Sequence, residues 1–309
     1  MIERLAAAVI GCVLLVGPSL AQAPSLVWDV RARIANDDFD SAERLIIDYR
    51  RRLGATPEAL EALSWLGRGA LAARRFDAAE RYARNAYDLS VAQLKGRRLD
   101  LEPQLPIALG AAIEVLGQVA AARNARTEAV AFLEREWATY RGTSIAARIQ
   151  KNIHLISLVG TRAPALDLSE SLGPKPPSLD GLRGRVVLMF FWAHWCGDCK
   201  LQGPVLERMQ ARYGPRGLTV IAPTQRYGYV AAGRDAGPLE ERHYIDSVRE
   251  GHFPGLANVP VPLAAANHER YGVSTTPTLV VIDRGGSVRF YHPGRITEAA
   301  LDAVLRPLL

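Results

Sequence analysis

Two kinds of hydrophobic patterning divide the chain near residue 157. Residues 25–155 carry apolar positions at helical spacing and few strand signals, which predicts an all-helical region. Beyond residue 160, short continuous apolar runs alternate with helix-like segments and end in a hairpin pattern, which is typical of a mixed α/β sheet. The 309 residues are enough for two domains. We therefore predict a helical domain at 24–157 and an α/β domain at 158–309.

The second domain has a readable order of elements. Strands are expected at 186–192, 218–222, 259–263, 279–283 and 288–292, and helices at 196–213, 239–250 and 297–308. The strand at 186–192 runs directly into the helix that begins at Cys196, so the chemistry of that junction depends on both elements.

The first residues have the pattern of a secretory signal. A charged start precedes an apolar run of ~12 residues, which is short for a membrane span of ~20. Small residues around Ala21 offer a cleavage site, so we interpret 1–23 as a signal peptide and expect an exported, periplasmic protein. Tethering through an uncleaved leader is the alternative. Cys12 lies in a lipobox-like stretch, but the apolar run continues past it, so we interpret it as a leader residue.

The chain is basic, with 38 Lys and Arg against 32 Asp and Glu and a formal charge of +6. Most of the basic residues are arginines spread along the predicted helices, such as Arg50–Arg52, without interleaved aromatic residues. This pattern, together with export, argues against a nucleic-acid partner. Solvated helix faces explain most of the excess, and attraction to an anionic membrane surface or an acidic partner is the alternative.

Two cysteines, Cys196 and Cys199, stand at the predicted junction of strand and helix. A thiol at a helix N-terminus meets unpaired backbone N–H groups and the helix dipole, which lower its pKa from about 8.5. The second thiol, one turn later, can resolve a mixed disulfide. Half of a zinc site is the alternative, but it needs two further ligands and only the leader residue Cys12 remains. The spacing therefore predicts a redox pair.

Sequence similarity within the helical region indicates a repeat. The segment Phe39–Arg44 recurs as Phe76–Arg81, and a Leu-Gly step followed by alanine twelve residues after the glycine occurs at Leu66-Gly67 and Leu116-Gly117. This pattern resembles the tetratricopeptide repeat, in which small residues let paired helices approach closely. The resemblance implies a concave surface that holds a partner protein or peptide. A packing or oligomerisation platform is the alternative.

Three motifs of the second domain carry a further resemblance. They are Trp192-Ala193-His194-Trp195-Cys196-Gly197-Asp198-Cys199-Lys200, Pro204 within the following helix, and Thr276-Pro277. Together they resemble the thioredoxin-like superfamily, and within it the TlpA/ResA-type exported thiol–disulfide oxidoreductases.

The resemblance implies a thioredoxin-like fold and an assignment of roles. Cys196 attacks a disulfide in a client protein and Cys199 resolves the mixed disulfide. Trp195 shapes the approach, and Thr276-Pro277, at the position of the family's cis-proline, positions the client backbone. The partners are then a client protein with a disulfide and a membrane electron donor or redox partner protein. No metal or organic cofactor is implied.

Two positions depart from the family pattern. Phe190 stands where the family has a buried proton-transfer acid, and Gln202 stands where the TlpA/ResA branch often has a glutamate. We therefore expect deprotonation of Cys199 to rely on water or on a residue from the loop after Ala222.

Several neighbours of the cysteines are candidates for redox tuning. Asp198, next to Gly197, places a negative charge near the Cys196 thiolate, which would make the pair more reducing. The alternative is a solvated acid in the first helical turn. His194 could tune Cys196 as a titrating neighbour, or it could be an exposed residue of little consequence. The loop at 225–238 is either a substrate-facing lip or a simple flexible loop.

Two other functions fit the fold. A thiol peroxidase of the redoxin group expects a Thr-x-x-Cys pocket with a remote arginine, and the segment Trp192-Ala193-His194-Trp195-Cys196 has no such threonine. A non-catalytic thioredoxin-fold adaptor is the third hypothesis. The intact pair Cys196 and Cys199 argues against it.

Overall fold

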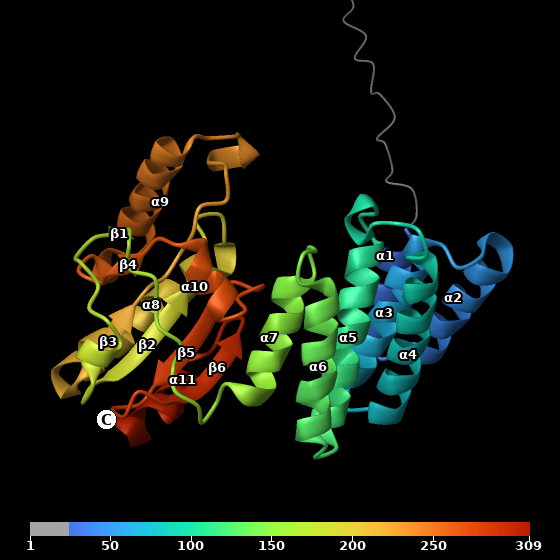
Figure 1. Ribbon diagram of the computed structural model, residues 1–309, viewed down its shortest axis with the longest axis horizontal. Coiled ribbons are helices and arrows are strands. Elements are labelled where there is room, and N and C mark those ends of the chain that lie inside the picture. Colours follow the sequence, from blue (N-terminus) through green and yellow to red (C-terminus); the bar gives the residue numbers. More distant parts are fainter. Residues whose placement is uncertain (1–24) are drawn as a thin grey trace, which may run out of the picture.

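The structure is a computed structural model that describes residues 25–309. It consists of a helical domain followed by an α/β domain, as Figure 1 shows. The predicted signal peptide at 1–23, with Cys12, lies outside the described residues.

The helical domain contains seven described α-helices. They are α1 (Leu26–Ala35), α2 (Phe39–Leu53), α3 (Pro57–Ala72), α4 (Phe76–Gln93), α5 (Leu105–Ala122), α6 (Arg126–Tyr140) and α7 (Ala146–Ser157). This confirms the all-helical prediction. A short 3-10 turn at Leu99–Leu101 lies in the longer connection between α4 and α5, where prolines interrupt the helical periodicity.

The helices pack in two layers. Helices α1, α3, α5 and α7 are neighbours in one layer, and α2, α4 and α6 each pack against the flanking members of that layer. The predicted close approaches occur at the Leu-Gly steps. A Cβ added at Gly117 would lie 2.8 Å from Leu133 of α6, and one at Gly67 would lie 3.4 Å from the backbone of Ala83 in α4. The glycines therefore set the spacing of the two layers.

Helix α5 is the central element of this domain. It is the one described helix that is long and apolar enough to cross a membrane, but 67% of that stretch is buried inside the domain. Residues from Leu105 to Val119 contact both hydrophobic clusters of the helical region. Its apolar composition is therefore explained by its place in the core.

The α/β domain is built on a four-stranded sheet with the order β3-β2-β5-β6. Strand β2 pairs in parallel with β3 and antiparallel with β5, which pairs antiparallel with β6. The mixed sheet predicted from the sequence is confirmed. Its elements are β1 (Ser171–Leu172), β2 (Val186–Phe191), α8 (Gly197–Tyr213), β3 (Leu218–Ile221), α9 (Pro238–His252), β4 (Val261–Pro262), α10 (Ala265–Arg270), β5 (Thr278–Ile282), β6 (Val288–Pro293) and α11 (Glu298–Leu305).

Strand β2 lies in the middle of the core. All six of its residues are buried. Because side chains alternate along a strand, Val186, Leu188 and Phe190 join the cluster under α8 and α11, and Val187, Met189 and Phe191 join the cluster on the other face. A strand buried on both faces explains the continuous apolar run in the sequence.

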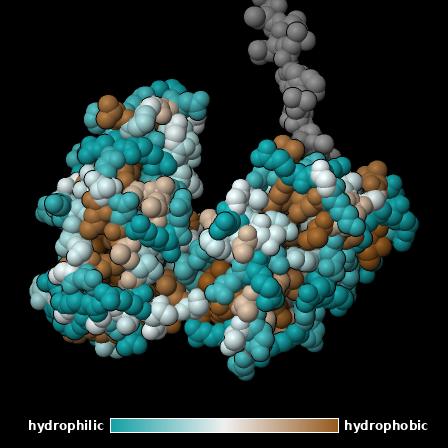
Figure 2. Space-filling view, viewed as in Figure 1, coloured by the Kyte–Doolittle hydropathy of each residue, from teal (hydrophilic) through white to brown (hydrophobic). Residues whose placement is uncertain are grey.

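The two domains meet where α7 packs beside β6 (Figure 1). The ring of His154 lies 2.9 Å from the carbonyl oxygen of Arg270 and 6.1 Å from the ring of Tyr291. A Cβ at Gly272 would lie 2.6 Å from the backbone nitrogen of Lys151, so the backbones are in close contact there. Beyond this junction the domains form separate lobes with a hollow between them on the face drawn in Figure 2.

Candidate redox site

The two cysteines lie where β2 passes into α8. Cys196 is the N-cap of α8, and its sulfur accepts a hydrogen bond from the backbone N–H of Cys199 at 3.0 Å. The two sulfurs are joined in a disulfide, and both residues are buried, Cys196 with 4% of its surface exposed. In the reduced protein the same N–H group and the helix dipole would stabilise a thiolate at Cys196.

A second predicted feature lies on the neighbouring strand. The peptide bond between Thr276 and Pro277 is cis. Phe191 pairs with Thr278, so the register places Pro277 beside the residue that follows β2. The hydroxyl oxygen of Thr276 is buried and has no hydrogen-bond partner within residues 25–309. The sheet therefore brings the cis-proline loop to the same end of β2 as the cysteines.

His194 is buried, with 1% of its surface exposed, so its description as an exposed residue is wrong. The reason is an aromatic enclosure formed after β3. The rings of Tyr227, Tyr229 and Tyr244 meet the imidazole edge to face, with centroids 5.3 to 5.6 Å away. Burial lowers the pKa of His194, although the carboxylate of Glu241 beside it favours the protonated ring.

Glu241 is a buried carboxylate that the sequence analysis missed. One of its oxygens lies 3.4 Å from Nε2 of His194, and only 1% of the residue is exposed. The carboxylate also accepts hydrogen bonds from the backbone N–H groups of Tyr227 and Gly228, at 2.5 and 2.9 Å. In the sequence, Glu241 looks like an ordinary acid in the first turn of a helix, so no local signal distinguishes it.

The loop at 225–238 is anchored by these contacts. Glu241 binds its first residues, and the ring of Tyr227 packs against Trp195 at 5.5 Å. A backbone bridge between Tyr229 and Asp235 folds the rest of the loop into a hairpin. The loop therefore lies against the residues that precede Cys196, and its contact with a substrate stays a prediction.

The remaining neighbours of the cysteines differ in exposure. Trp195 is 50% exposed beside the buried disulfide. A Cβ at Gly197 would meet no atom within 4 Å. The side chain of Asp198 is 62% exposed and lies 3.6 Å from the guanidinium of Arg295. Solvent and this counter-charge screen Asp198, which supports its alternative role as a solvated acid.

The two departures from the family pattern have structural roles. Phe190 is buried and packs edge to face on Phe253, with ring centroids 5.8 Å apart. Gln202 is also buried, and its carbonyl accepts a hydrogen bond from the backbone of Ile296 at 2.9 Å. Gln202 therefore ties α8 to the segment before α11. The buried carboxylate of this site is Glu241, and it faces His194.

The part of the chain that matches a known family begins at the boundary between the two domains. The family model named Redoxin matches residues 158–305. The C-terminal domain has a thioredoxin-like fold and is similar to thiol–disulfide oxidoreductases of the TlpA/ResA type. All of the site residues described above lie in this domain, and the helical domain precedes the matched residues.

The relatives of this thioredoxin-like domain span about half of the chain. The thioredoxin-like protein YneN of Bacillus subtilis is 28% identical over 146 residues, which cover 47% of this chain and 78% of YneN. The thiol-disulfide oxidoreductase ResA of Oceanobacillus iheyensis is 27% identical and covers 51% of this chain and 77% of its own length. The thiol:disulfide interchange protein HelX of Rhodobacter capsulatus is 29% identical, with coverage of 50% and 78%.

Among solved structures, a thiol:disulfide interchange protein of the thioredoxin family from Chlorobium tepidum is 23% identical. The aligned residues cover 48% of this chain and 95% of the Chlorobium chain, with a TM-score of 0.36.

Proposed function

We propose that this protein is a thiol–disulfide oxidoreductase that acts on disulfides of client proteins. The observation that carries this proposal is the disulfide between Cys196 and Cys199 at the N-terminus of α8, with the cis-proline loop beside it. The names of the relatives ResA and HelX support the same activity.

The chemistry is a pair of thiol–disulfide exchanges. In the reduced protein, the Cys196 thiolate attacks one sulfur of a client disulfide, and the other client sulfur leaves as a thiolate. Cys199 then loses its proton and attacks the sulfur of Cys196, so the intramolecular disulfide forms and the second client thiolate leaves. Two electrons pass to the client, and a thiol donor protein must return them to Cys196 and Cys199.

The surrounding residues fit the positioning of an extended client segment. Trp195, the residue before Cys196, is half-exposed and packs on Tyr227, so its ring can contact a client segment. The Thr276-Pro277 loop supplies backbone groups to a client strand. We assign redox tuning to His194, with smaller contributions from Gly197 and Asp198.

We further propose that the protein is exported and works as a reductase. The leader pattern at 1–23 supports a periplasmic location, and the screened charge of Asp198 adds a small contribution in the reducing direction. A reductase in this compartment needs a membrane electron donor or a redox partner protein. The tetratricopeptide-like helical domain would bind a client or this partner.

The reduction potential tests the direction of the reaction. The purified protein is equilibrated with glutathione or dithiothreitol buffers, and the fraction of disulfide is measured. A value near or below about −250 mV, as in thioredoxin, supports a reductase, and a value near about −120 mV means an oxidant instead.

A trapping experiment tests the activity itself. When the reduced Cys199→Ser variant is mixed with client proteins that contain a disulfide, it is expected to accumulate a mixed disulfide between Cys196 and the client, because the resolving thiol is missing. Cys196→Ser is the matched control and should trap nothing. If the wild-type protein reduces hydrogen peroxide faster than it reduces insulin, the peroxidase hypothesis replaces this one. If it catalyses neither reaction, the adaptor hypothesis does.

A further inference from the structure

The layer of α1, α3, α5 and α7 carries a cluster of positive charges outside the redox site. We name as the cationic face the surface formed by Arg31, Trp65, Arg68, Glu114, Arg148 and Lys151. Each of the four helices of this layer contributes at least one of these residues. The face therefore runs across the whole helical domain.

At one end of this face, an aromatic ring lies between two guanidinium groups. Arg31 of α1 lies over the ring of Trp65 at 4.2 Å, and Arg68 lies over it at 4.1 Å. A hollow of about 310 Å³ adjoins them, with apolar lining from Ile34 and Ala35. Stacking on Trp65 holds both cations in place without neutralising them.

Further along the face, one buried carboxylate serves two cations. Glu114 of α5 accepts from Nε of Arg148 at 3.0 Å and from the ammonium group of Lys151 at 2.8 Å. Burial alone would raise the pKa of Glu114, but these two charges lower it to about 2. The carboxylate of Glu114 therefore balances one of these two positive charges, and one positive charge remains in excess at this end of the face.

The charge of Arg68 is the next feature of the cationic face. Arg68 makes no hydrogen bond or ion pair with any group in residues 25–309, although it is half-buried. Burial lowers the pKa of Arg68, and repulsion by Arg148 and Arg31 lowers it further, against the attraction of Glu114. The cationic face as defined holds four cations and one carboxylate, Glu114, and Glu61 beside it also attracts Arg31. A half-buried guanidinium facing like charges is costly unless an anion joins it.

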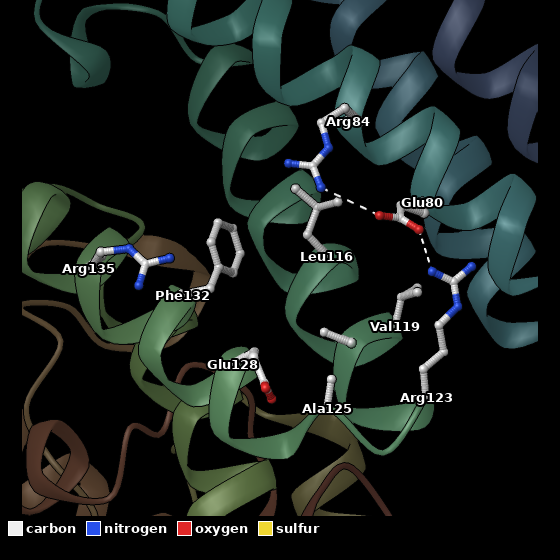
Figure 3. Close-up of a pocket in the computed structure, with 10 residues that line it drawn as sticks. Glu80, Arg84, Leu116, Val119, Arg123, Ala125, Glu128, Phe132 and Arg135 are labelled. Carbon is white, nitrogen blue, oxygen red and sulfur yellow. Dashed lines mark hydrogen bonds and ion pairs between the residues drawn. The ribbon is translucent and has the colours of Figure 1, made fainter.

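A second groove of the same domain shows the contrast. It lies between α4, α5 and α6, and Figure 3 shows its apolar floor with charged residues around it. There, Glu80 binds the guanidinium groups of both Arg84 and Arg123, and Asp77 also binds Arg123. Arg84 and Arg123 are thus ion-paired in this groove, whereas Arg31 and Arg68 on Trp65 make no ion pair within residues 25–309.

We propose that the cationic face binds an acidic segment of a partner protein, with glutamate or aspartate carboxylates on Arg31 and Arg68. A guanidinium binds a carboxylate through two parallel hydrogen bonds, and the hollow beside Trp65 accepts an apolar side chain of the same segment. Neighbouring helices pack about 8–10 Å apart, so four helices give room for roughly eight extended residues. This binding goes beyond the redox activity and does not depend on it.

The test measures binding of a fluorescein-labelled ten-residue peptide, in which five glutamates alternate with alanine and leucine, by fluorescence polarisation. The control peptide has glutamine in place of each glutamate. We expect the purified protein to bind the glutamate peptide at least about tenfold more tightly, since each charge-assisted hydrogen bond contributes about 1.5–3 kcal/mol. Raising the salt concentration should weaken this binding.

Variants locate the site. Arg31→Gln and Arg68→Gln are each expected to weaken binding of the glutamate peptide about tenfold, and Arg84→Gln, in the neutralised groove, should leave it unchanged. Arg31 is exposed, so its replacement does not threaten the fold, and melting temperatures check all three variants. Insulin reduction should be the same in all of them, so a failure of the redox proposal is seen separately.

Three results would overturn the proposal. The two peptides could bind equally, or the Arg31 and Arg68 variants could bind the glutamate peptide as tightly as the wild type. The third result is binding to phosphatidylglycerol vesicles that these two variants weaken while the peptide does not bind. That outcome would make the face a contact for an anionic membrane.

Discussion

The two domains each bury a carboxylate, and they neutralise it in opposite ways. Glu241 of the thioredoxin-like domain is held by two backbone N–H groups and faces the titratable ring of His194. Glu114 of the helical domain is held by Arg148 and Lys151. Backbone N–H groups satisfy a carboxylate without adding charge, so the net charge beside the cysteines can change with the protonation of His194.

This difference fits the two roles that we propose, chemistry at the cysteines of the thioredoxin-like domain and binding of a partner on the helical domain. Near the cysteines, the buried carboxylate of Glu241 faces His194, which three tyrosine rings enclose, and the reacting atoms lie within one helical turn. On the helical domain, the charges are permanent, and they are spread over four helices. A permanent charge pattern suits the binding of another charged molecule, and a titratable group suits the adjustment of a thiol.

The largest effect is expected from Glu114→Ala. It leaves the partly buried Arg148 and Lys151 beside Arg68 without this counter-charge, and breaking a buried ion pair in this way costs up to about 3–5 kcal/mol. Glu114→Gln keeps an acceptor and should cost less. Urea unfolding measures both. A loss below about 1 kcal/mol for Glu114→Ala would mean that the carboxylate does not hold this layer together.

The next effect concerns pH and the thioredoxin-like domain. Burial lowers the pKa of His268, which packs on Phe191, from 6.5 to about 4. The unfolded chain therefore binds a proton that the folded protein excludes between these two pH values. The free energy of unfolding should fall by up to about 3 kcal/mol as the pH drops from 6.5 to 4.

His268→Gln is the variant that isolates this contribution. It removes the titrating group, so its unfolding free energy should depend less on pH over the same range. The measurement is a set of urea unfolding curves between pH 4 and 7.5. Equal pH slopes for the variant and the wild type would show that His268 is not the group responsible.

A matched pair of glycines tests the junction between the two domains. Gly272 has a φ of +59°, and a Cβ there would lie 2.6 Å from the backbone of Lys151, so Gly272→Ala should cost about 1–3 kcal/mol. Gly197→Ala meets no atom within 4 Å and should change the stability little. Thermal unfolding compares the two variants. Equal melting temperatures would mean that the backbones of α7 and the segment before β5 separate freely.

The smallest effect is expected at Asp198. Because its side chain is 62% exposed and lies near Arg295, Asp198→Asn should raise the reduction potential by only about 10 mV. The direction follows from removing a negative charge near the Cys196 thiolate. Equilibration with glutathione buffers measures the shift. A change of several tens of mV would restore Asp198 as the main tuning residue.

The sequence was sufficient for features that depend on neighbouring residues. The apolar run before Cys196 and the spacing to Cys199 predicted the strand, the helix and the position of the pair. The peptide bond before Pro277 is cis, as the family resemblance implied. The helical periodicity of residues 25–155 predicted an all-helical domain, which the structure has. The strand, the helix and the helical domain follow from rules that act within a few residues, such as side-chain alternation and helix ends, whereas the cis-proline was implied by the family resemblance.

Only the tertiary structure decided which distant charges meet. His194 and Glu241 are 47 positions apart, and Arg31 and Arg148 are 117 apart. The pattern of polar positions shows that a residue lies on a helix face, but it does not show which helix packs beside that face. Burial and separation determine the strength of an electrostatic interaction, and both are set by packing. The sequence alone therefore determined where the two cysteines lie, and the packing determined which buried acid lies near them and which charges form the cationic face.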